Sequence, residues 1–527
     1  MPGTRNPWLA LSALCLGFFM IMVDTTIVNL AIPVILQDLR TDLDQVLWVA
    51  NAYVLVYAAL LVAAGRLGDL FGQKRTYIAG LVIFAGASAW CGMVHHIGPL
   101  IAARSLQGLG AALLTPQTTA FIALLFPPER RGAAYGMWSG VAGLATITGP
   151  LLGGVIVTQY GWHWLFFINV PVGVVCLVLV ALLVPAHRAG QPKPLDLPGV
   201  SLVSAGLFAL SFGLLEGERF HWGTVAGPLS IPLVLAAAVV LFAAFAWQQR
   251  RSGQPLIPPA LLAYRNFTLA NAVVITVTFA LAGSLLLLTI YLQTVSRLSP
   301  LRAGLTIAPL SAAFGLVGIV VGRRSTAENS KTFLIRGLGV YAAGLVATLV
   351  AVRPEASTWT LIVPMLVCGL GLGCVFAPMS TIALGQLDRQ LAGAASGVYN
   401  TTRQVAYVLG AAVIGALLQG LLAGRVTASG RVQARALPAQ ARPTFVHGVG
   451  DLASGGLHHL GGGHAAAPAG LSSPVAQEFQ RLSGIAFAHG LADAVRLSML
   501  APIAAVLCAI VCCLGLRRGG ESGSRQT

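Results

Sequence analysis

One carboxylate and one arginine stand out because each lies inside a long apolar stretch of the sequence. Asp24 follows about 16 residues after Trp8, so it is roughly 24 Å along the helix expected there. Arg104 lies about five residues into another apolar run, whose helix is expected to cross in the opposite direction. If the apolar layer is about 30 Å thick, Arg104 is therefore at a depth similar to that of Asp24. A charge at this depth costs several kcal/mol unless it is paired or hydrated.

Two interpretations of this pair remain open. If the two helices are neighbours, Asp24 and Arg104 can titrate as one unit, and a bound cation then competes with the proton, which is the basis of antiport. Alternatively, the ion pair only fixes helix packing. Other polar residues within or at the mouths of apolar runs either cross-link helices or contact a substrate; they are Asn29, Gln107, Asn400, Arg403 and Gln404.

A short turn between two apolar runs reads GRLGDLFGQKR, from Gly65 to Arg75. It combines glycines (Gly65 and Gly72), an acid (Asp69) and a basic end (Lys74 and Arg75). Asp69 can accept hydrogen bonds from a helix N-terminus or from Arg130, which predicts a cytoplasmic latch that breaks when parts of the protein move. The alternative is a basic loop that only sets topology.

A second glycine-rich segment, TITGPLLGG, lies inside an apolar run. Pro150 removes a backbone hydrogen bond, and Gly149, Gly153 and Gly154 permit close helix contact. The segment predicts a kinked and tightly packed hinge helix, although small residues at this spacing also serve ordinary packing.

The elements that carry these residues must be membrane helices. The chain has 527 residues, of which 56% are hydrophobic and 9% are charged, whereas a soluble domain carries about 25% charged residues. Windows of roughly 20 apolar residues predict fourteen spans, which begin near Trp8, Val46, Thr76, Pro99, Ala134, Trp164, Val200, Thr224, Thr268, Arg302, Phe333, Trp359, Ser396 and Leu497. This composition excludes a soluble protein.

The basic residues orient the predicted spans. The net charge of +16 is dispersed over short loops and tails, which argues against a nucleic-acid partner. Most of these residues fall on the side that holds both termini, so both termini are expected in the cytoplasm. The segment at about 423–493 is expected to be a long outer loop, partly disordered. His458, His459 and His464 fall in it, and we predict no metal site.

The sequence repeats itself weakly. Gly65 and Lys74 of the first turn match Gly322 and Lys331 of a later one, and GLGAALLTPQTT resembles GLGLGCVFAPMST. We therefore predict a six-helix half at 1–184, a linker with an inserted helix pair at 185–266, and a second six-helix half at 267–527. Duplicated halves around a central site are typical of transporters, which rock one half against the other.

Several chemistries are excluded by what the sequence lacks. It has no GxxxxGK[ST] loop for nucleotide hydrolysis, and no HExxH helix that would indicate a metallohydrolase. We therefore expect neither an enzyme nor a cofactor, and we expect the proton gradient to supply the energy.

Together, five segments resemble the major facilitator superfamily, and within it the fourteen-span drug:proton antiporter family of EmrB/QacA type. They are DTTIVNLAIP from Asp24, GRLGDLFGQKR from Gly65, RSLQGLGAA from Arg104, TGPLLGG from Thr148, and WHWLFFINVPVG from Trp162. The resemblance covers nearly the whole chain. Two positions depart from the pattern: Ala145 replaces a frequent glycine, and Thr326 stands opposite Asp69 in the second half.

The resemblance implies an all-α integral membrane protein that exports hydrophobic drugs or antibiotics, cationic ones among them, in exchange for protons. Asp24 and Arg104 would couple the two flows, and Asp69 would belong to the gate. We expect a monomer in the lipid bilayer of a bacterial plasma membrane, with a small-molecule substrate. Alternatives are an exporter of an endogenous metabolite and, from another class, a membrane sensor or scaffold that does not transport.

Overall fold

The computed structural model describes most of the chain, in a series of residue ranges. They are 6–41, 43–186, 196–217, 219–220, 222–253, 255–326, 328–355, 357–384, 387, 391–454 and 473–517. The side chains of Asn29 and Pro150, and those of several other helical residues, lie outside the described set. His458, His459, His464 and Glu218 also lie outside it.

The N-terminal part of the chain forms long helices joined by tight turns. They are α1 (Pro7–Asp38), α2 (Leu43–Phe71), α3 (Gln73–Met93), α4 (Ile97–Leu125), α5 (Pro128–Tyr160), the short α6 (His163–Phe167) and α7 (Asn169–Leu183). The Asn6 side chain accepts a hydrogen bond from Trp8 N and so caps α1. Gly72, with φ of 91°, occupies a conformation between α2 and α3 that favours glycine.

A helix pair follows: α8 (Leu197–Glu216) and α9 (Ile231–Arg251), joined by an antiparallel hairpin of β1 (Thr224–Ala226) and β2 (Leu229–Ser230). The eighth span was expected to begin near Thr224, but the hairpin occupies that place and the helix begins at Ile231. The pair packs against α2 and α15, and Asn51 in α2 donates a 2.8 Å hydrogen bond to Glu216 at the end of α8.

The C-terminal part repeats the helical plan after the short α10 (Pro259–Ala263). Its helices are α11 (Arg265–Ile290), α12 (Pro300–Arg324), α13 (Ser330–Ala351), α14 (Ile362–Leu384), α15 (Ala392–Gln433), α16 (Arg442–Ser454), α17 (Ser473–Ser498) and α18 (Leu500–Leu514). A π-helical turn, Tyr291–Val295, extends α11, and 3-10 turns lie at Thr358–Leu361, Ala434–Ala436 and Ala439–Ala441.

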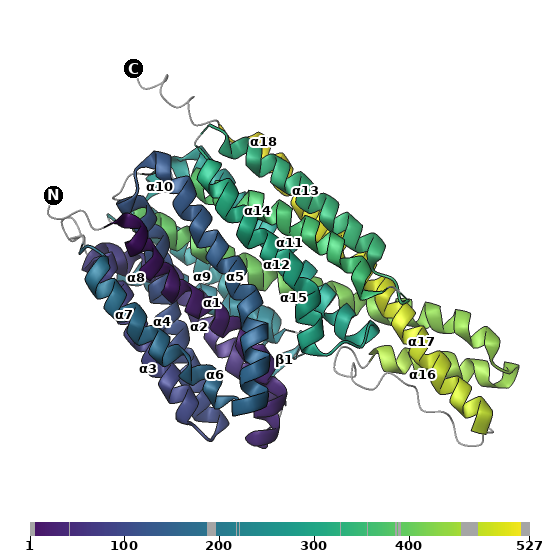
Figure 1. Cartoon of the computed structure of the whole chain (residues 1–527). Helices are drawn as coiled ribbons and strands as arrows, with labels where there is room; N and C mark the ends of the chain where they lie inside the picture. Colours follow the sequence, from purple (N-terminus) through teal and green to yellow (C-terminus); the bar gives the residue numbers. More distant parts are fainter. Residues whose placement is uncertain are drawn as a thin grey trace.

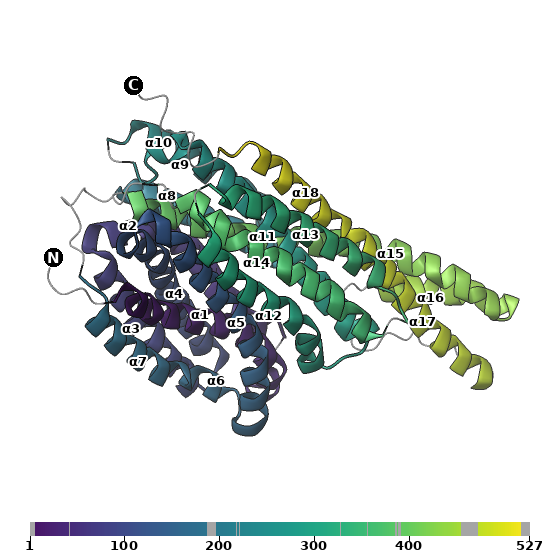
Figure 2. The same ribbon diagram turned by 45° about the horizontal axis from the view of Figure 1, so that its top comes forward.

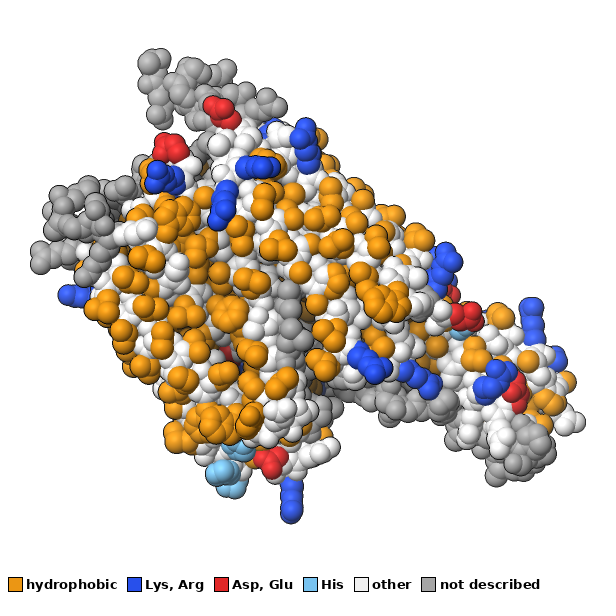
Figure 3. Space-filling view, in the orientation of Figure 1, with side chains coloured by type: hydrophobic (Ala, Val, Ile, Leu, Met, Phe, Trp, Pro, Cys, Tyr) orange, Lys and Arg blue, Asp and Glu red, His pale blue; other side chains and the backbone are white. Residues whose placement is uncertain are grey.

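Thirteen helical segments of the described chain are long and apolar enough to cross a membrane. Their order matches the spans expected from the sequence, with the exception of α5, which is not among the thirteen although it has 33 residues. The start of α1 and the end of α18 lie at the same end of the bundle, which we call the terminal end (Figure 1). Hydrophobic side chains cover the visible flank between the two ends (Figure 3).

The segment expected to be a partly disordered loop at about 423–493 is largely helical in its described part. Helix α15 has 42 residues, which at 1.5 Å each is roughly twice the thickness of a bilayer core, and α16 and α17 pack against it. This helical extension projects beyond the rest of the bundle at the end opposite the terminal end (Figures 1 and 2). These helices were not expected, because their weak apolar periodicity hides a face that buries Phe445 and Phe479 against each other. The Gly/Ala/His-rich middle of the segment, 455–472, lies outside the described residues.

The two parts of the chain use equivalent contacts as scaffold. Lys74 Nζ, at the start of α3, donates to the carbonyl oxygens of Ala181 and Val184 at the end of α7. Lys331 Nζ, at the start of α13, donates to those of Leu514 and Leu516 at the end of α18. A cation at a helix C-terminus is favourable because the carbonyl groups there lack partners within the helix.

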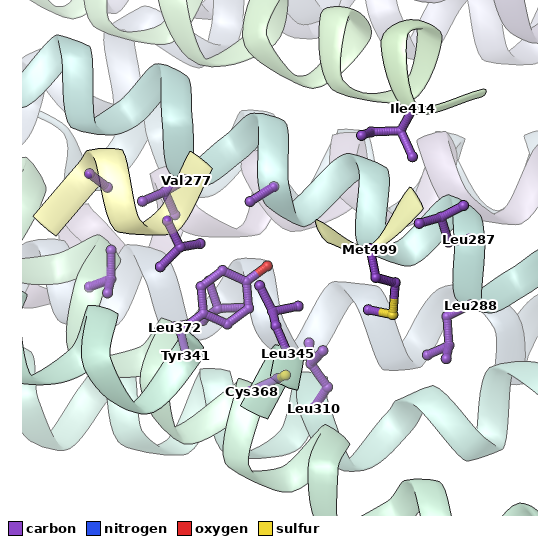
Figure 4. Close-up of a cluster of buried hydrophobic side chains, with 14 of the residues drawn as sticks. Val277, Leu287, Leu288, Leu310, Tyr341, Leu345, Cys368, Leu372, Ile414 and Met499 are labelled. Carbon is purple, nitrogen blue, oxygen red and sulfur yellow. The ribbon is translucent and has the colours of Figure 1, made fainter. Parts of the chain in front are cut away.

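The hydrophobic core is continuous between the N-terminal and C-terminal parts only toward the terminal end. The largest cluster joins Leu11, Phe18, Ile122 and Trp138 from the terminal half of α1, α4 and α5 to the C-terminal helices. The outer halves of α1, α2 and α4 belong to a separate cluster made of N-terminal residues alone. Figure 4 shows the C-terminal part of the large cluster, where side chains of α11 to α15 converge with Met499, which lies between α17 and α18. The two parts therefore meet tightly at the terminal end.

Candidate functional site

Asp24 and Arg104 form a buried ion pair between α1 and α4. Arg104 Nη1 lies 2.6 Å from Asp24 Oδ2, and the two side chains are 1% and 0% exposed. Because water does not reach either group, the pair is neither hydrated nor screened, and each charge depends on the other. The sequence predicted their similar depth, and the structure places them in direct contact.

Three further polar side chains surround the carboxylate. Asn169 Nδ2, from the first turn of α7, donates to Asp24 Oδ1 at 2.9 Å. Gln107 Nε2 lies 3.4 Å from the same oxygen, and Gln107 Oε1 accepts from Arg104 Nη1 at 2.8 Å. Ser88 Oγ, from α3, accepts from both Gln107 and Asn169. Every polar atom near Asp24 is thus oriented by a second one, which fixes the geometry of the carboxylate.

Arg104 is held from a second direction by α2. Its Nε donates to the carbonyl oxygen of Val49 at 3.0 Å, and its guanidinium carbon lies 4.3 Å from the centre of the Tyr53 ring. The cation therefore has partners on α1, α2 and its own helix. Loss of the Asp24 charge would leave it with the backbone carbonyl, Gln107 and the ring as partners.

Ser88 and Asn169 were not identified as site residues from the sequence. Ser88 is a single hydroxyl in an apolar run, and such residues usually bond to their own helix. Asn169 lies within WHWLFFINVPVG, where it is the only amide, but its helix is far from Asp24 in the chain. In the sequence, each of the two is only a polar residue among apolar ones. The packing of α3 and α7 on α1 and α4 is what brings Ser88 and Asn169 to Asp24.

Asp69 contacts the N-terminus of α15, at the terminal end. Its carboxylate faces the backbone amides of Gly393 and Ala394, and Gln73 Nε2 lies 3.4 Å from Oδ1. A Cβ built on Gly393 would collide with this carboxylate, so glycine permits the approach. Gly65, one turn earlier, would meet Gly393 O at 2.8 Å and Gly397 Cα at 2.9 Å if it carried a Cβ. We call this contact of α2 with α15 the latch.

The basic residues expected beside Asp69 lie elsewhere. Arg75 and Arg130 are exposed, whereas Lys74 caps the end of α7 as described above. The neighbouring Arg131 is 5% exposed and donates to the carbonyl oxygens of Phe126 and Ala123 at the end of α4. In this structure Asp69 faces a helix N-terminus, the first of the two partners considered from the sequence, and the cation that acts on it is Arg66, three residues earlier in α2.

The glycine-rich segment of α5 packs on both sides. A Cβ on Gly149 would collide with Thr26 Oγ1 of α1, and one on Gly154 would lie 3.6 Å from Leu301 of α12. Nearer the terminal end, Gly136 and Gly322 leave no room for a Cβ where α5 crosses α12. Gly153 is buried, and the helix continues through Pro150 without interruption.

The polar residues of α15 lie at its contact with the N-terminal helices. Asn400 Nδ2 donates to Thr119 Oγ1 of α4 at 3.1 Å. The Arg403 guanidinium carbon lies 4.8 Å from the ring centre of Trp138 in α5. Gln404 is partly exposed. Asn29 lies in α1, five positions beyond Asp24, with its side chain outside the described set. Among the described residues no three His, Cys, Asp or Glu side chains gather as metal ligands.

This geometry, an ion pair inside a helical bundle and a contact between two repeated parts, can be compared with known proteins. The profile of the Major Facilitator Superfamily matches residues 14–411. The tetracenomycin C resistance and export protein of Streptomyces glaucescens is 35% identical over 426 residues, which cover 79% of this chain and 77% of that protein.

A second relative, the multidrug resistance protein Stp of Mycobacterium tuberculosis, is 34% identical over 419 residues, which cover 79% of this chain and 77% of that protein. Among solved structures, human MFSD10 aligns with a TM-score of 0.57 over 78% of this chain and 93% of that one. At 13% identity this likeness concerns the fold alone. The chain is a multi-pass membrane transporter that belongs to the Major Facilitator Superfamily, and its relatives fit the drug:proton antiporter type.

Proposed function

We propose that this protein exports hydrophobic drugs or antibiotics in exchange for protons. The observation that carries the proposal is the buried Asp24 carboxylate, which is 0% exposed and is held by Arg104 and Asn169 inside a membrane-spanning bundle. Burying a carboxylate inside the membrane is energetically costly, so its presence there indicates a function. The printed names of two relatives, one for tetracenomycin C export and one for multidrug resistance, support the substrate class.

In this proposal Asp24 holds the transported proton. When the carboxylate is charged, Arg104 neutralises it, and when it takes up a proton, the 2.6 Å contact loses its ionic component. Arg104 then relies more on Val49 O and the Tyr53 ring, which lie on α2. Protonation is thereby linked to the position of α2, whose other end carries Asp69 and the latch.

The latch would close the cytoplasmic side. We infer that the terminal end is cytoplasmic, because the loops there carry most of the basic residues. We also infer that α5 crosses the membrane, which raises the number of spans from thirteen to fourteen, arranged as six helices, an inserted pair and six helices. The tight contact of α2 with α15 and of α5 with α12 at that end then corresponds to an outward-facing state. Rocking of one half against the other would open it.

The remaining features follow from this arrangement. We propose a monomer in a bacterial plasma membrane, because the chain itself supplies both halves and the site lies within one of them. The carboxylate needs no metal or organic cofactor to bind and release a proton, so the proton gradient would be the energy source. The small-molecule substrate and protons are then the ligands.

The test is Asp24→Asn in a drug-sensitive bacterial host. The wild-type chain is expected to raise resistance to some of a panel of antibiotics and dyes that includes tetracenomycin C, and a protonophore is expected to abolish export of an accumulated dye. Asp24→Asn keeps the volume and several hydrogen bonds but cannot carry the proton, so export should fall at least tenfold at an unchanged level of membrane-inserted protein.

Asp493→Asn is the matched control, because Asp493 is exposed on α17 and pairs with Arg496 only at 3.8 Å. It should export like the wild type. Undiminished proton-dependent export by Asp24→Asn would refute the coupling role. Failure of the wild-type chain to export any compound of the panel would favour an endogenous metabolite.

A further inference from the structure

Arg403 is a cation between the two halves that no described carboxylate neutralises. It lies on α15, with its guanidinium carbon 4.8 Å from the Trp138 ring of α5, and it interacts electrostatically with the Tyr57 hydroxyl of α2. Tyr57 in turn donates to Thr115 of α4 at 3.1 Å. Thus one charged side chain of the C-terminal half contacts two helices of the N-terminal half, and Tyr57 links it to a third.

These residues share one level of the bundle. Trp138 lies ten residues from the terminal end of its helix, Arg403 eleven and Thr115 ten, which corresponds to roughly 15 Å in each helix. In a hydrocarbon core of about 30 Å this is the middle of the membrane. Transporter substrate sites commonly lie at this level, between the repeated halves.

The buried carboxylates inside the described bundle face partners other than Arg403. Asp24 pairs with Arg104, Asp69 faces the amides of α15, Glu216 binds Asn51 and Arg219, and Asp196 accepts from Gln248 and Gln249. Arg403 therefore differs from Arg104: both are arginines within the spans, but only Arg104 has an acid. An aromatic ring and a hydroxyl compensate a guanidinium only in part, so a negative group of a ligand would find an unneutralised partner.

Hydrogen-bond donors at the same level also lack acceptors. Trp138 Nε1, Tyr135 OH and Thr401 Oγ1 are buried and have no hydrogen-bond partner. Trp138 and Tyr135 are 1% and 0% exposed, so water does not satisfy them from outside. The contact between the halves at this level thus offers a cation, unpartnered polar groups and flat aromatic rings, among which Trp138 stacks on Phe18 with ring centres 4.9 Å apart. A ligand with acceptor atoms on an aromatic plane complements this set.

We propose that Arg403, with Tyr57 and Trp138, forms a substrate site that selects planar aromatic compounds bearing a negative group, such as a carboxylate or a phenolate. The proposal rests on the proposed export function and narrows its substrate class, away from the cationic compounds expected from the family resemblance. The ligand lies between the halves, since Arg403 belongs to one and the two rings belong to the other. Its anion takes the guanidinium, and its ring plane packs beside Trp138 when the halves part.

The experiment compares two dyes that share a xanthene ring system and differ in charge. Fluorescein is the anionic probe and rhodamine 6G the cationic one, and export of each is measured from energised cells that express the wild type or a variant. The wild type is expected to export fluorescein several-fold faster than rhodamine 6G. Arg403→Gln should reduce fluorescein export about tenfold and leave rhodamine 6G export within about twofold, and Arg403→Glu should reverse the preference.

Two further variants separate binding from folding. Arg403→Lys keeps the charge without the planar guanidinium, so it should retain a substantial part of the fluorescein export. Quenching of tryptophan fluorescence by fluorescein in purified protein measures binding without transport, and it should weaken in Arg403→Gln and recover in Arg403→Lys. If Arg403→Gln is not inserted, the comparison of Arg403→Lys with the wild type on both dyes still decides, because a charge-selective site predicts retained anion preference.

The proposal is overturned if the variants change the two dyes equally, or if the wild type prefers rhodamine 6G. The export function fails in a different way. In that case the wild type exports neither dye nor any antibiotic of the wider panel, and Asp24→Asn changes nothing. If the protein exports the dyes but substitution of Arg403 does not change its preference for the anionic one, the export function stands and only the proposed anion site is refuted.

Discussion

The two halves of the protein share a scaffold but differ in what they bury. Gly80 of α3 packs against Gly110 of α4, and Gly337 of α13 packs against Gly371 of α14, with Phe84 and Tyr341 at matching places. Lys74 and Lys331 cap the last helix of each half in the same way. Helix packing, set by glycines and helix ends, is therefore equivalent in both.

At positions with the same offset from these glycines, the side chains have opposite character. Ser88 of α3 corresponds to Leu345 of α13, and in α4 the residues Arg104 and Gln107 correspond to Met365 and Cys368 of α14. Figure 4 shows Leu345 and Cys368 packed with Tyr341 and Leu372 in an apolar cluster. The place of the N-terminal ion pair is thus filled in the C-terminal half by hydrophobic side chains.

This difference shows that the fold does not require the polar cluster. A buried ion pair often contributes no more to stability than a well-packed apolar replacement, and the C-terminal half is such a replacement within the same chain. The latch is likewise one-sided. Asp69 faces α15, whereas at the matching place Thr326 forms a local turn with Asn329. The N-terminal half contains the buried ion pair and Asp69, whereas the C-terminal half supplies Arg403 and the helix end that Asp69 contacts.

The largest effect is expected when the N-terminal pair is converted to its C-terminal counterpart. Arg104→Met alone leaves Asp24 buried without its cation, which should cost about 3–5 kcal/mol of unfolding free energy. Adding Asp24→Leu removes the uncompensated charge and should restore much of that stability, with export still absent. Unfolding in mixed micelles and dye export measure the two quantities. A double variant that exports like the wild type would show that the pair is only structural.

An intermediate effect is expected from Ser88→Ala. It removes the acceptor shared by Gln107 and Asn169, so two buried donors lose a partner, at a cost of about 1–3 kcal/mol. Export should also fall several-fold, because both amides orient Asp24. The control is Ser105→Ala, whose hydroxyl bonds only to Ile101 O of its own helix. That variant should remain within about 0.5 kcal/mol of the wild type in the same measurements.

The smallest effect is expected at the two lysine caps, where the halves should behave alike. Lys74→Met and Lys331→Met each remove hydrogen bonds to two helix-end carbonyls at a partly exposed place, for about 1 kcal/mol apiece. Thermal unfolding should report equal losses. A loss confined to Lys74 would mean that the equivalence of the two scaffolds is only geometric. Arg75→Met, on an exposed side chain, serves as the control with little change.

The sequence alone determined the membrane class, the order of the spans and the depth of Asp24 and Arg104. These follow from local quantities: apolar length, the rise per residue and the distribution of charge. The sequence did not indicate the full length of α15, or α16 and α17 beside it, because the exposed faces of these helices interrupt the run of apolar residues that marks a membrane span. The predicted start of α9, Thr224, is seven residues too early, because the short hairpin before the helix is also rich in apolar residues.

Tertiary structure alone decided the partners. Ser88 and Asn169 join Asp24 only because α3 and α7 pack around α1 and α4, and no spacing within the chain brings residues this far apart together. The same holds for Asp69. The sequence left a helix N-terminus and Arg130 as its candidate partners, and only the position of α15 in space decides for the helix N-terminus. It also holds for Arg403, because the absence of a carboxylate beside it depends on every neighbouring helix. Depth along a helix is local and can be counted, whereas the neighbour across a helix interface depends on the whole fold.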